Sequence, residues 1–186
     1  MEDPGLVEHL KYVSVVDCGE KHTVAINNAG IMYSWGDDQL SVGSCFYPTQ
    51  VTGLINVRCV KASCGAKFTC CVTNEKVAFI WGLYPQMMTS MNPLNCVENE
   101  RGAISKFRSS GPAPIITLLQ YRFVDVSCYN SCISLLTDGG ELLYWNMNEI
   151  KYHVVNRKPR EVRQLQDVAK FSCGDGWLLA HHYSEN

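Results

Sequence analysis

The sequence predicts an all-β fold in which a four-stranded antiparallel unit is repeated within a single domain. Three observations favour this fold. A pattern of proline, cysteine and tryptophan recurs along the 186 residues. Each copy holds short β-branched segments separated by turn residues. No amphipathic helix longer than two turns is evident. Self-similarity at a period of a few tens of residues is typical of stacked or radial repeat architectures.

The spacing within the repeat is tight. Cysteine and tryptophan are 17 residues apart in three copies: Cys18 and Trp35, Cys64 and Trp81, Cys128 and Trp145. A fourth copy contains Cys173 but no following tryptophan. Each copy opens with a proline, and the copies span approximately residues 4–47, 48–113, 114–158 and 159–186.

The first copy shows how the strands are expected to follow one another. Residues 13–16 and 23–26 are apolar and β-branched, as half-buried strands are. Residues 27–30 tolerate positive φ, so residues 31–35 return as the second arm of a hairpin. The proline-led segment adds a fourth strand. Four short strands per unit, repeated about three and a half times, predict a partial, open β-propeller with four-stranded antiparallel blades.

Two sets of positions are expected to be structural. Gly19, Gly65 and Gly174 follow the aligned cysteines and should permit close backbone approach, whereas the third copy has Tyr129 there. The tryptophans recur at one blade position, so Trp35, Trp81 and Trp145 are expected to pack in the core between blades.

These residues resemble the regulator-of-chromosome-condensation repeat family, whose members fold as seven-bladed propellers. The first copy matches the family pattern at Val13, Val16, Gly19, His22, Ala25, Gly30, Tyr33, Trp35 and Gly36. The family's histidine occurs once, and its equivalents are Phe68, Cys132 and Trp177. The resemblance covers nearly the whole chain except about residues 83–111. It implies a ring that three and a half repeats cannot close, so we expect either a piece of a longer protein or an open propeller that must pair its ends.

An insert separates the second and third copies. From tryptophan to the next proline is 33 residues in the second copy, against 13 and 14 in the first and third. Loops of this length in compact domains are usually functional or disordered. Residues 83–111 are therefore expected to be mobile and to contact a partner, with these candidate side chains: Met87, Met88, Met91, Arg101, Lys106 and Arg108.

The ten cysteines contain no C-x-x-C pair, and four of them occupy one repeat position in separate units. Such positions seldom converge on one metal ion, so we expect free, mostly buried thiols, no metal and no cofactor. Free thiols favour an intracellular protein, cytoplasmic or nuclear. No segment has the apolar length of a membrane span, and no association with a membrane is expected.

Catalytic motifs are absent from the sequence: it has no phosphate-binding loop, no G-x-S-x-G and no H-E-x-x-H. We therefore expect no enzyme activity and no catalytic residues, and a function in binding a protein partner through blade loops and the insert. The family resemblance implies an alternative, guanine-nucleotide exchange on a small GTPase such as Ran. A second alternative is chromatin or DNA binding through basic residues of the insert and of residues 151–163.

Overall fold

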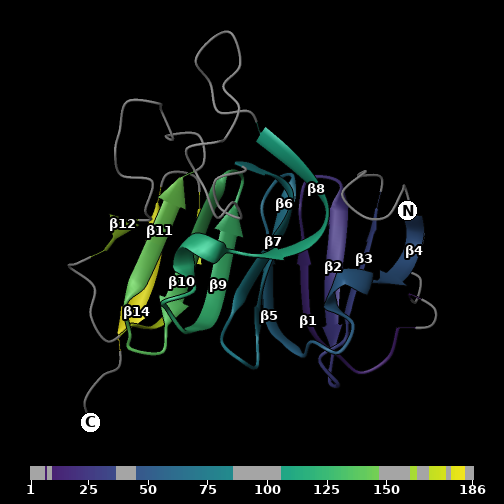
Figure 1. The fold of residues 1–186 in the computed structure, drawn as a ribbon, viewed down its shortest axis with the longest axis horizontal. Helices are drawn as coiled ribbons and strands as arrows, with labels where there is room; N and C mark the ends of the chain where they lie inside the picture. Colours follow the sequence, from purple (N-terminus) through teal and green to yellow (C-terminus); the bar gives the residue numbers. More distant parts are fainter. Residues whose placement is uncertain are drawn as a thin grey trace, which may run out of the picture.

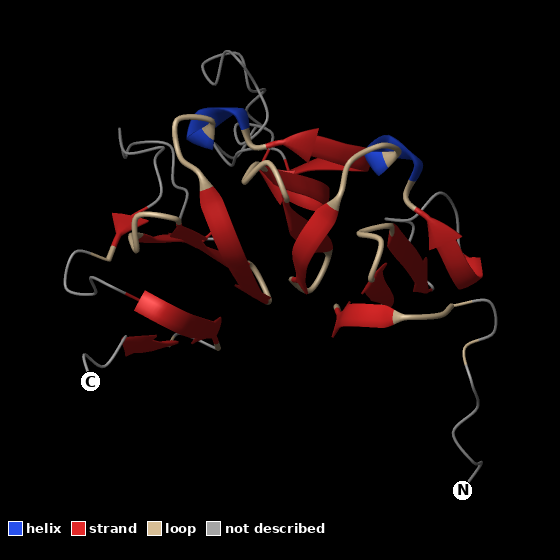
Figure 2. Ribbon diagram, turned by 90° about the horizontal axis from the view of Figure 1, so that it is seen from below, coloured by secondary structure: helices blue, strands red, loops and turns tan. Residues whose placement is uncertain are grey.

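The computed structural model describes residues 7, 10–36, 45–85, 106–146, 160–162, 168–174 and 177–182. The strands in these segments form four antiparallel sheets, three with four strands and one with two. The sheets lie side by side along an arc, with the first and last sheets at its two ends (Figure 1, Figure 2). The sequence prediction of an open propeller of four-stranded blades is confirmed.

Each sheet is one blade, and the strands follow the chain. Blade 1 contains β1 (Val13–Cys18), β2 (His22–Asn27), β3 (Met32–Gly36) and β4 (Cys45–Gln50). Blade 2 contains β5 (Cys59–Cys64), β6 (Phe68–Thr73), β7 (Ala78–Pro85) and β8 (Lys106–Pro114). Blade 3 contains β9 (Phe123–Tyr129), β10 (Cys132–Thr137), β11 (Leu142–Asn146) and β12 (Arg160–Glu161). Blade 4 contains β13 (Val168–Cys173) and β14 (Leu178–His182). Short 3-10 helices, η1 (Thr52–Leu54) and η4 (Ile116–Leu118), connect blades 1 to 2 and 2 to 3.

In blades 1, 2 and 3, the turn between the second and third strands is stabilised by a side chain that accepts hydrogen bonds from backbone N–H groups of the turn. In blade 1, Asn27 Oδ1 accepts hydrogen bonds from the N–H groups of Ala29 and Ile31, both at 3.0 Å, and Gly30 has φ of 82°. Thr73 and Thr137 occupy the equivalent position, and each hydroxyl accepts one N–H across its turn. Small polar side chains commonly close turns in this way.

Blades 1, 2 and 3 have the predicted fourth strand, but in blades 1 and 2 the prediction that proline begins this strand is wrong. The strand also belongs to the blade before the copy that its proline opens. β4 contains Pro48 and pairs with β3, and β8 ends at Pro114 and pairs with β7. A repeat counted from its proline is therefore out of phase with the blades by one strand. Each outer strand links one blade to the next through the connector that follows it.

The hydrophobic core lies between blades rather than at one centre. Blades 1 and 2 bury one cluster that includes Val24, Ile26, Ala62, Cys64 and Trp81. Blades 2 and 3 bury a second, which includes Phe68, Cys70, Val126, Cys128 and Trp145. Blades 3 and 4 bury a smaller third cluster of Leu136, Leu142 and Val168. The three interfaces follow one another along the arc, because β1 packs beside β5, β5 beside β9 and β9 beside β13.

The tryptophan prediction is confirmed at two positions and wrong at the third. Trp81 and Trp145 are buried, each against the preceding blade. Trp35 is only half-buried, and Cys18, predicted to be buried like the other aligned cysteines, is exposed. Both residues lie on the side of blade 1 against which no described blade packs.

Candidate protein-binding surface

A recurring hydrogen bond, here called the blade clasp, joins each blade to the next. The residue before an aligned cysteine accepts the backbone N–H of the aligned cysteine in the following blade. The three clasps are Cys64 N–H to Asp17 Oδ2 at 2.8 Å, Cys128 N–H to Ser63 Oγ at 2.9 Å and Cys173 N–H to Ser127 Oγ at 3.0 Å. Sequence analysis missed these acceptors. Their signal is a small polar residue, Asp or Ser, at the same position of every copy.

The backbone reinforces the clasps. Glu20 N–H donates to the carbonyl of Ala66 at 3.0 Å, and Ala66 N–H donates to that of Asn130 at 2.8 Å. In addition, Ser63 Oγ donates to Asp17 Oδ2 at 2.8 Å. The polar side chains at the ends of β1, β5 and β9 therefore hold neighbouring blades together. Because their hydrogen bonds are used in this way, they are poorly suited to catalysis.

Gly65 and Gly174 permit close packing against a side-chain ring, where the sequence had predicted close approach of backbone. A Cβ at Gly65 would lie 2.0 Å from the ring of Phe68, and one at Gly174 would lie 2.0 Å from the ring of Trp177. The third copy reverses the sizes, because Tyr129 replaces the glycine and the small Cys132 replaces the ring. In each of these copies one of the two positions holds a small residue and the other a large one. The small Cys132 leaves room for the Tyr129 side chain, which explains why the third copy tolerates the loss of its glycine.

His22 occupies the same position as Phe68 and Trp177. Its Nε2 lies 2.8 Å from the hydroxyl of Thr69 in blade 2, and both residues are buried. This contact is to a side chain of the next blade. The imidazole therefore helps to join two blades, which favours a structural role over that of a base.

The eight cysteines whose side chains are described carry free thiols, and seven of them are buried. Burial raises the pKa of the Cys70 thiol and of the Cys128 thiol well above the usual range. Thiolate is the nucleophilic form, so a raised pKa makes a thiol inert at neutral pH. Cys70 and Cys128 are therefore suited to packing rather than to chemistry.

The insert is shorter than the sequence suggested, because the two strands around it are long. β7 and β8 remain paired beyond the blade, with Leu83 opposite Arg108 and Pro85 opposite Lys106. Lys106 and Arg108, expected in a mobile loop, are therefore strand residues. The start of β8 projects past the neighbouring strands (Figure 1), and this paired extension is called the β7–β8 arm. Met87, Met88, Met91 and Arg101 lie outside the described residues.

The two connectors present an exposed aliphatic side chain at the same position. Leu54 and Leu118 are buried, and the residues that follow them, Ile55 and Leu119, are exposed. η1 packs beside β8, where a Cβ at Gly53 would lie 2.7 Å from the Pro112 ring. β8 leads directly into η4. We call Ile55 and Leu119, together with residues 111–114 at the end of β8, the connector surface.

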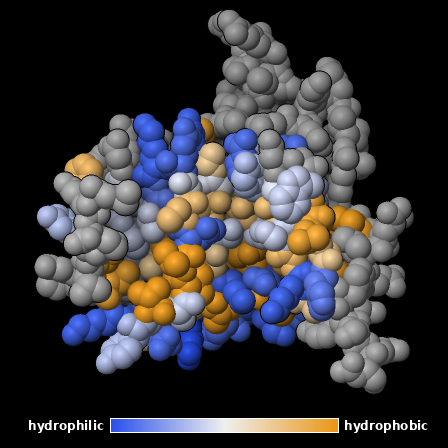
Figure 3. All heavy atoms as spheres, turned by 180° about the vertical axis from the view of Figure 1, so that it is seen from behind, coloured by the Kyte–Doolittle hydropathy of each residue, from blue (hydrophilic) through white to orange (hydrophobic). Residues whose placement is uncertain are grey.

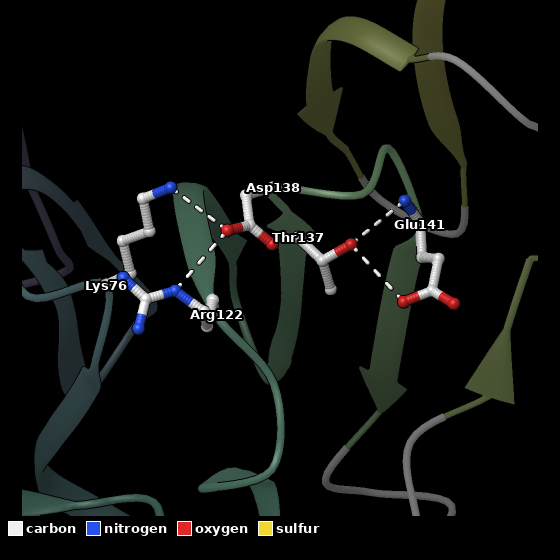
Figure 4. A network of polar contacts seen from close by, with 5 residues as sticks. All are labelled: Lys76, Arg122, Thr137, Asp138 and Glu141. Atoms are coloured by element: carbon white, nitrogen blue, oxygen red, sulfur yellow. Dashed lines mark hydrogen bonds and ion pairs between the residues drawn. The ribbon is translucent and has the colours of Figure 1, made fainter.

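Charged residues join blades 2 and 3 at their hairpin ends (Figure 4). Asp138 Oδ2 lies 3.0 Å from Lys76 Nζ and 3.4 Å from Arg122 Nε. The hydrogen bond from Lys76 lowers the pKa of Asp138, and the positive charges of Lys76 and Arg122 lower it further. Asp138 offsets one of these two positive charges and holds both cations in contacts within the protein.

The described residues contain no group of three or more His, Cys, Asp or Glu side chains that could hold a metal ion. Nor does any helix within the described segments have the length and apolar character needed to cross a membrane.

Comparison with known proteins identifies the repeat. The family model described as "Regulator of chromosome condensation (RCC1) repeat" matches residues 29–72. Residues 29–72 are a repeat of the RCC1 type. The match runs from β3 through β6, so the RCC1 repeat joins the second half of one blade to the first half of the next. This is the same offset between repeat and blade that β4 and β8 display.

Curated relatives are much longer than this chain. Human E3 ubiquitin-protein ligase HERC2 is 26% identical over 201 residues, which cover 94% of this chain and 4% of that protein. Human probable E3 ubiquitin-protein ligase HERC6 is 27% identical over 226 residues, covering 91% of this chain and 22% of that protein. The chain thus spans a small part of these relatives.

Solved RCC1-type structures share the fold. Prp20p from Saccharomyces cerevisiae, described with its binding properties to Gsp1p and histones, has a TM-score of 0.64 and 17% identity, covering 91% of this chain and 42% of that one. At this identity the likeness establishes the propeller fold alone.

Proposed function

We propose that this chain is a non-catalytic protein-binding module that contacts its partner through the connector surface and the β7–β8 arm. The observation that carries the proposal is the repeated exposure of an aliphatic side chain, Ile55 and Leu119, on equivalent connectors of a rigid scaffold. Connecting segments on a rigid scaffold are where such folds place recognition. A catalytic role has little support, because buried polar residues such as Ser63 join blades and the pKa values of the buried Cys70 and Cys128 thiols are raised.

The chemistry of the surface indicates the kind of partner. Aliphatic side chains at the centre of an interface favour an apolar patch on the partner, and a surrounding polar rim supplies specificity. Lys106 and Arg108 add two cations on β8. The expected partner is therefore a protein with an apolar patch bordered by acidic residues.

The test compares three forms of the chain as bait. The double variant Ile55→Asp with Leu119→Asp alters the connector surface, and Val60→Asp is the matched control, because Val60 is exposed on β5 rather than on a connector. Circular dichroism verifies that each variant is folded. We expect at least one protein, identified by quantitative mass spectrometry, to be captured by the wild type and Val60→Asp but lost with the double variant. The proposal fails if no captured protein depends on Ile55 and Leu119.

Guanine-nucleotide exchange is a second candidate. It is supported by the RCC1 repeats and by the binding of Prp20p to Gsp1p, which concerns that protein. The test measures the release of a fluorescent guanine nucleotide from a Ran-type GTPase. Acceleration by the chain, abolished by the double variant on the connectors, would favour exchange, whereas release at the spontaneous rate would exclude Ran-type GTPases as substrates.

Chromatin binding has less support from the described residues, since Lys76 and Arg122 are both paired with Asp138, which offsets one of their two charges. Binding driven by phosphate contacts weakens steeply as the salt concentration rises. Retention of the chain on nucleosomes with such a salt dependence would favour this function over protein binding.

A further inference from the structure

The two ends of the arc expose opposite halves of one interface. Side chains six residues after an aligned cysteine point toward the following blade, and those of Val24, Cys70 and Ser134 are fully buried. Leu179 is the equivalent residue of blade 4, and it is 65% exposed. Trp177 is 58% exposed, whereas its equivalents His22 and Phe68 are buried. These two residues define the blade 4 face.

The face at the other end complements it. Residues two before an aligned cysteine point toward the preceding blade, and Ala62 and Val126 are 9% and 6% exposed there. Val16 is their equivalent in blade 1, and it is 63% exposed. Together with exposed Cys18 and half-buried Trp35, it defines the blade 1 face. Figure 3 views the molecule from behind relative to Figure 1 and shows exposed apolar residues among polar ones on that side.

The polar groups of the clasp are also divided between the two ends. Ser172 precedes Cys173 and so occupies the acceptor position held by Ser63 and Ser127 in earlier blades, but it is exposed. Cys18 supplies the donor position, and its N–H donates to the side chain of Asp17 within its own blade, at 2.9 Å. One end thus has an acceptor that faces no described blade, and the other has a donor turned to a local partner.

We propose that two copies of the chain associate head to tail, with the blade 1 face of one copy packed on the blade 4 face of the other. The argument is continuity, because the chain already forms this interface between blades three times and presents both of its halves at the ends. In the contact, Val16 and Trp35 cover Leu179 and Trp177, and Cys18 N–H donates to Ser172 Oγ. The Trp177 ring already packs against Gly174, where a Cβ would lie 2.0 Å from it, so the face is formed before binding. Such an interface is heterologous, since its two surfaces differ.

A heterologous interface makes a distinctive prediction for mixtures. Val16→Asp blocks the blade 1 face and leaves the blade 4 face intact, while Leu179→Asp does the reverse. Light scattering should show wild-type mass rising with concentration, and each variant alone should stay monomeric. Mixed in equal amounts, the two variants should form a 1:1 dimer that grows no further, because each contributes its one intact face.

Controls separate this contact from loss of folding and from general stickiness. Val60→Asp introduces the same charge at an exposed aliphatic residue of β5, away from both faces and from the connector surface, and should associate like the wild type. Val16→Lys and Leu179→Lys, with unchanged circular dichroism, should repeat the result with the opposite charge. The proposal is overturned if the mixture remains monomeric, or if either single variant associates as strongly as the wild type. It does not depend on the proposed function, since no partner enters the measurement.

Discussion

Blades 1 and 2 carry the same residues at key positions, yet they differ in what those residues do. Trp81 is buried against blade 1, whereas Trp35, at the equivalent position of blade 1, is half-buried. Cys64 is buried and its N–H is clasped by Asp17, whereas Cys18 is exposed. The side chains match and the neighbours do not. In a repeat protein the energy of a position thus depends on whether a blade lies against it.

Replacement of the two tryptophans should give the largest difference between these regions. Trp81→Ala removes a large buried side chain and should lower the free energy of unfolding by about 3–5 kcal/mol. Trp35→Ala removes a half-buried one and should cost about 1 kcal/mol, near the average for point mutations. Urea unfolding of both variants measures the difference. Equal losses would mean that blade 1 is covered on that side.

Removal of a clasp acceptor should have the next largest effect. Ser63→Ala leaves the buried N–H of Cys128 without its acceptor and should cost about 1–3 kcal/mol. Ser172→Ala at the exposed end should change stability by less than about 0.5 kcal/mol in the monomer. Thermal unfolding at low protein concentration makes the comparison. A clasp of no importance would leave both variants at the wild-type midpoint.

The pairing of glycine with a bulky residue can be tested by a double-mutant cycle. Gly65→Ala places a Cβ against Phe68 and should cost about 1–3 kcal/mol through overpacking. In the background of Phe68→Cys, which imitates the third copy, the same substitution should cost little. The cycle measures the coupling between the two positions. Additive costs would show that the size of the Phe68 side chain is not the reason for the glycine.

The smallest effect is expected at the ion cluster on the hairpin ends. The pKa of Asp138 is lowered in the folded state, so its contribution to stability is present above the unfolded pKa, about 3.9, and is lost as the pH falls through the lower folded value. Asp138→Asn should therefore be less stable than the wild type at neutral pH, by a margin that closes in acid. The urea midpoints of both proteins, at neutral pH and at a pH below the folded pKa of Asp138, measure this difference in stability. An unchanged margin in acid would assign the effect to something other than charge.

Much of the fold was predictable because the same pattern of residues occurs in several copies along the chain. The hairpins, the fourth strands and the packing of Trp81 and Trp145 follow from β-branched segments, turn residues and fixed spacing. The phase of blades relative to repeats did not follow, because the pairing of β4 with β3 rather than β5 is a long-range choice. Nor did the exposure of Trp35 and Cys18, which depends on a missing neighbour rather than on local sequence.

The candidate surface was less accessible to sequence reasoning. The length of the insert was recognised, but the extension of β8 to Lys106 was missed, since residues 106–111 lack the period of a half-buried strand. Ile55 and Leu119 also escaped notice. Each of them follows another aliphatic residue, Leu54 or Leu118, and only the packing of the folded chain decides which residue of the pair is buried.

Hydrogen exchange at the aligned cysteines tests the central claim, that contacts between blades rather than the strand pattern hold this chain together. The measurement is best made on the monomeric variant Leu179→Asp, by nuclear magnetic resonance. The clasped N–H groups of Cys64 and Cys128 should exchange only through large-scale unfolding, and that of Cys18 should exchange orders of magnitude faster. Equal protection at Cys18 and Cys64 would contradict the account.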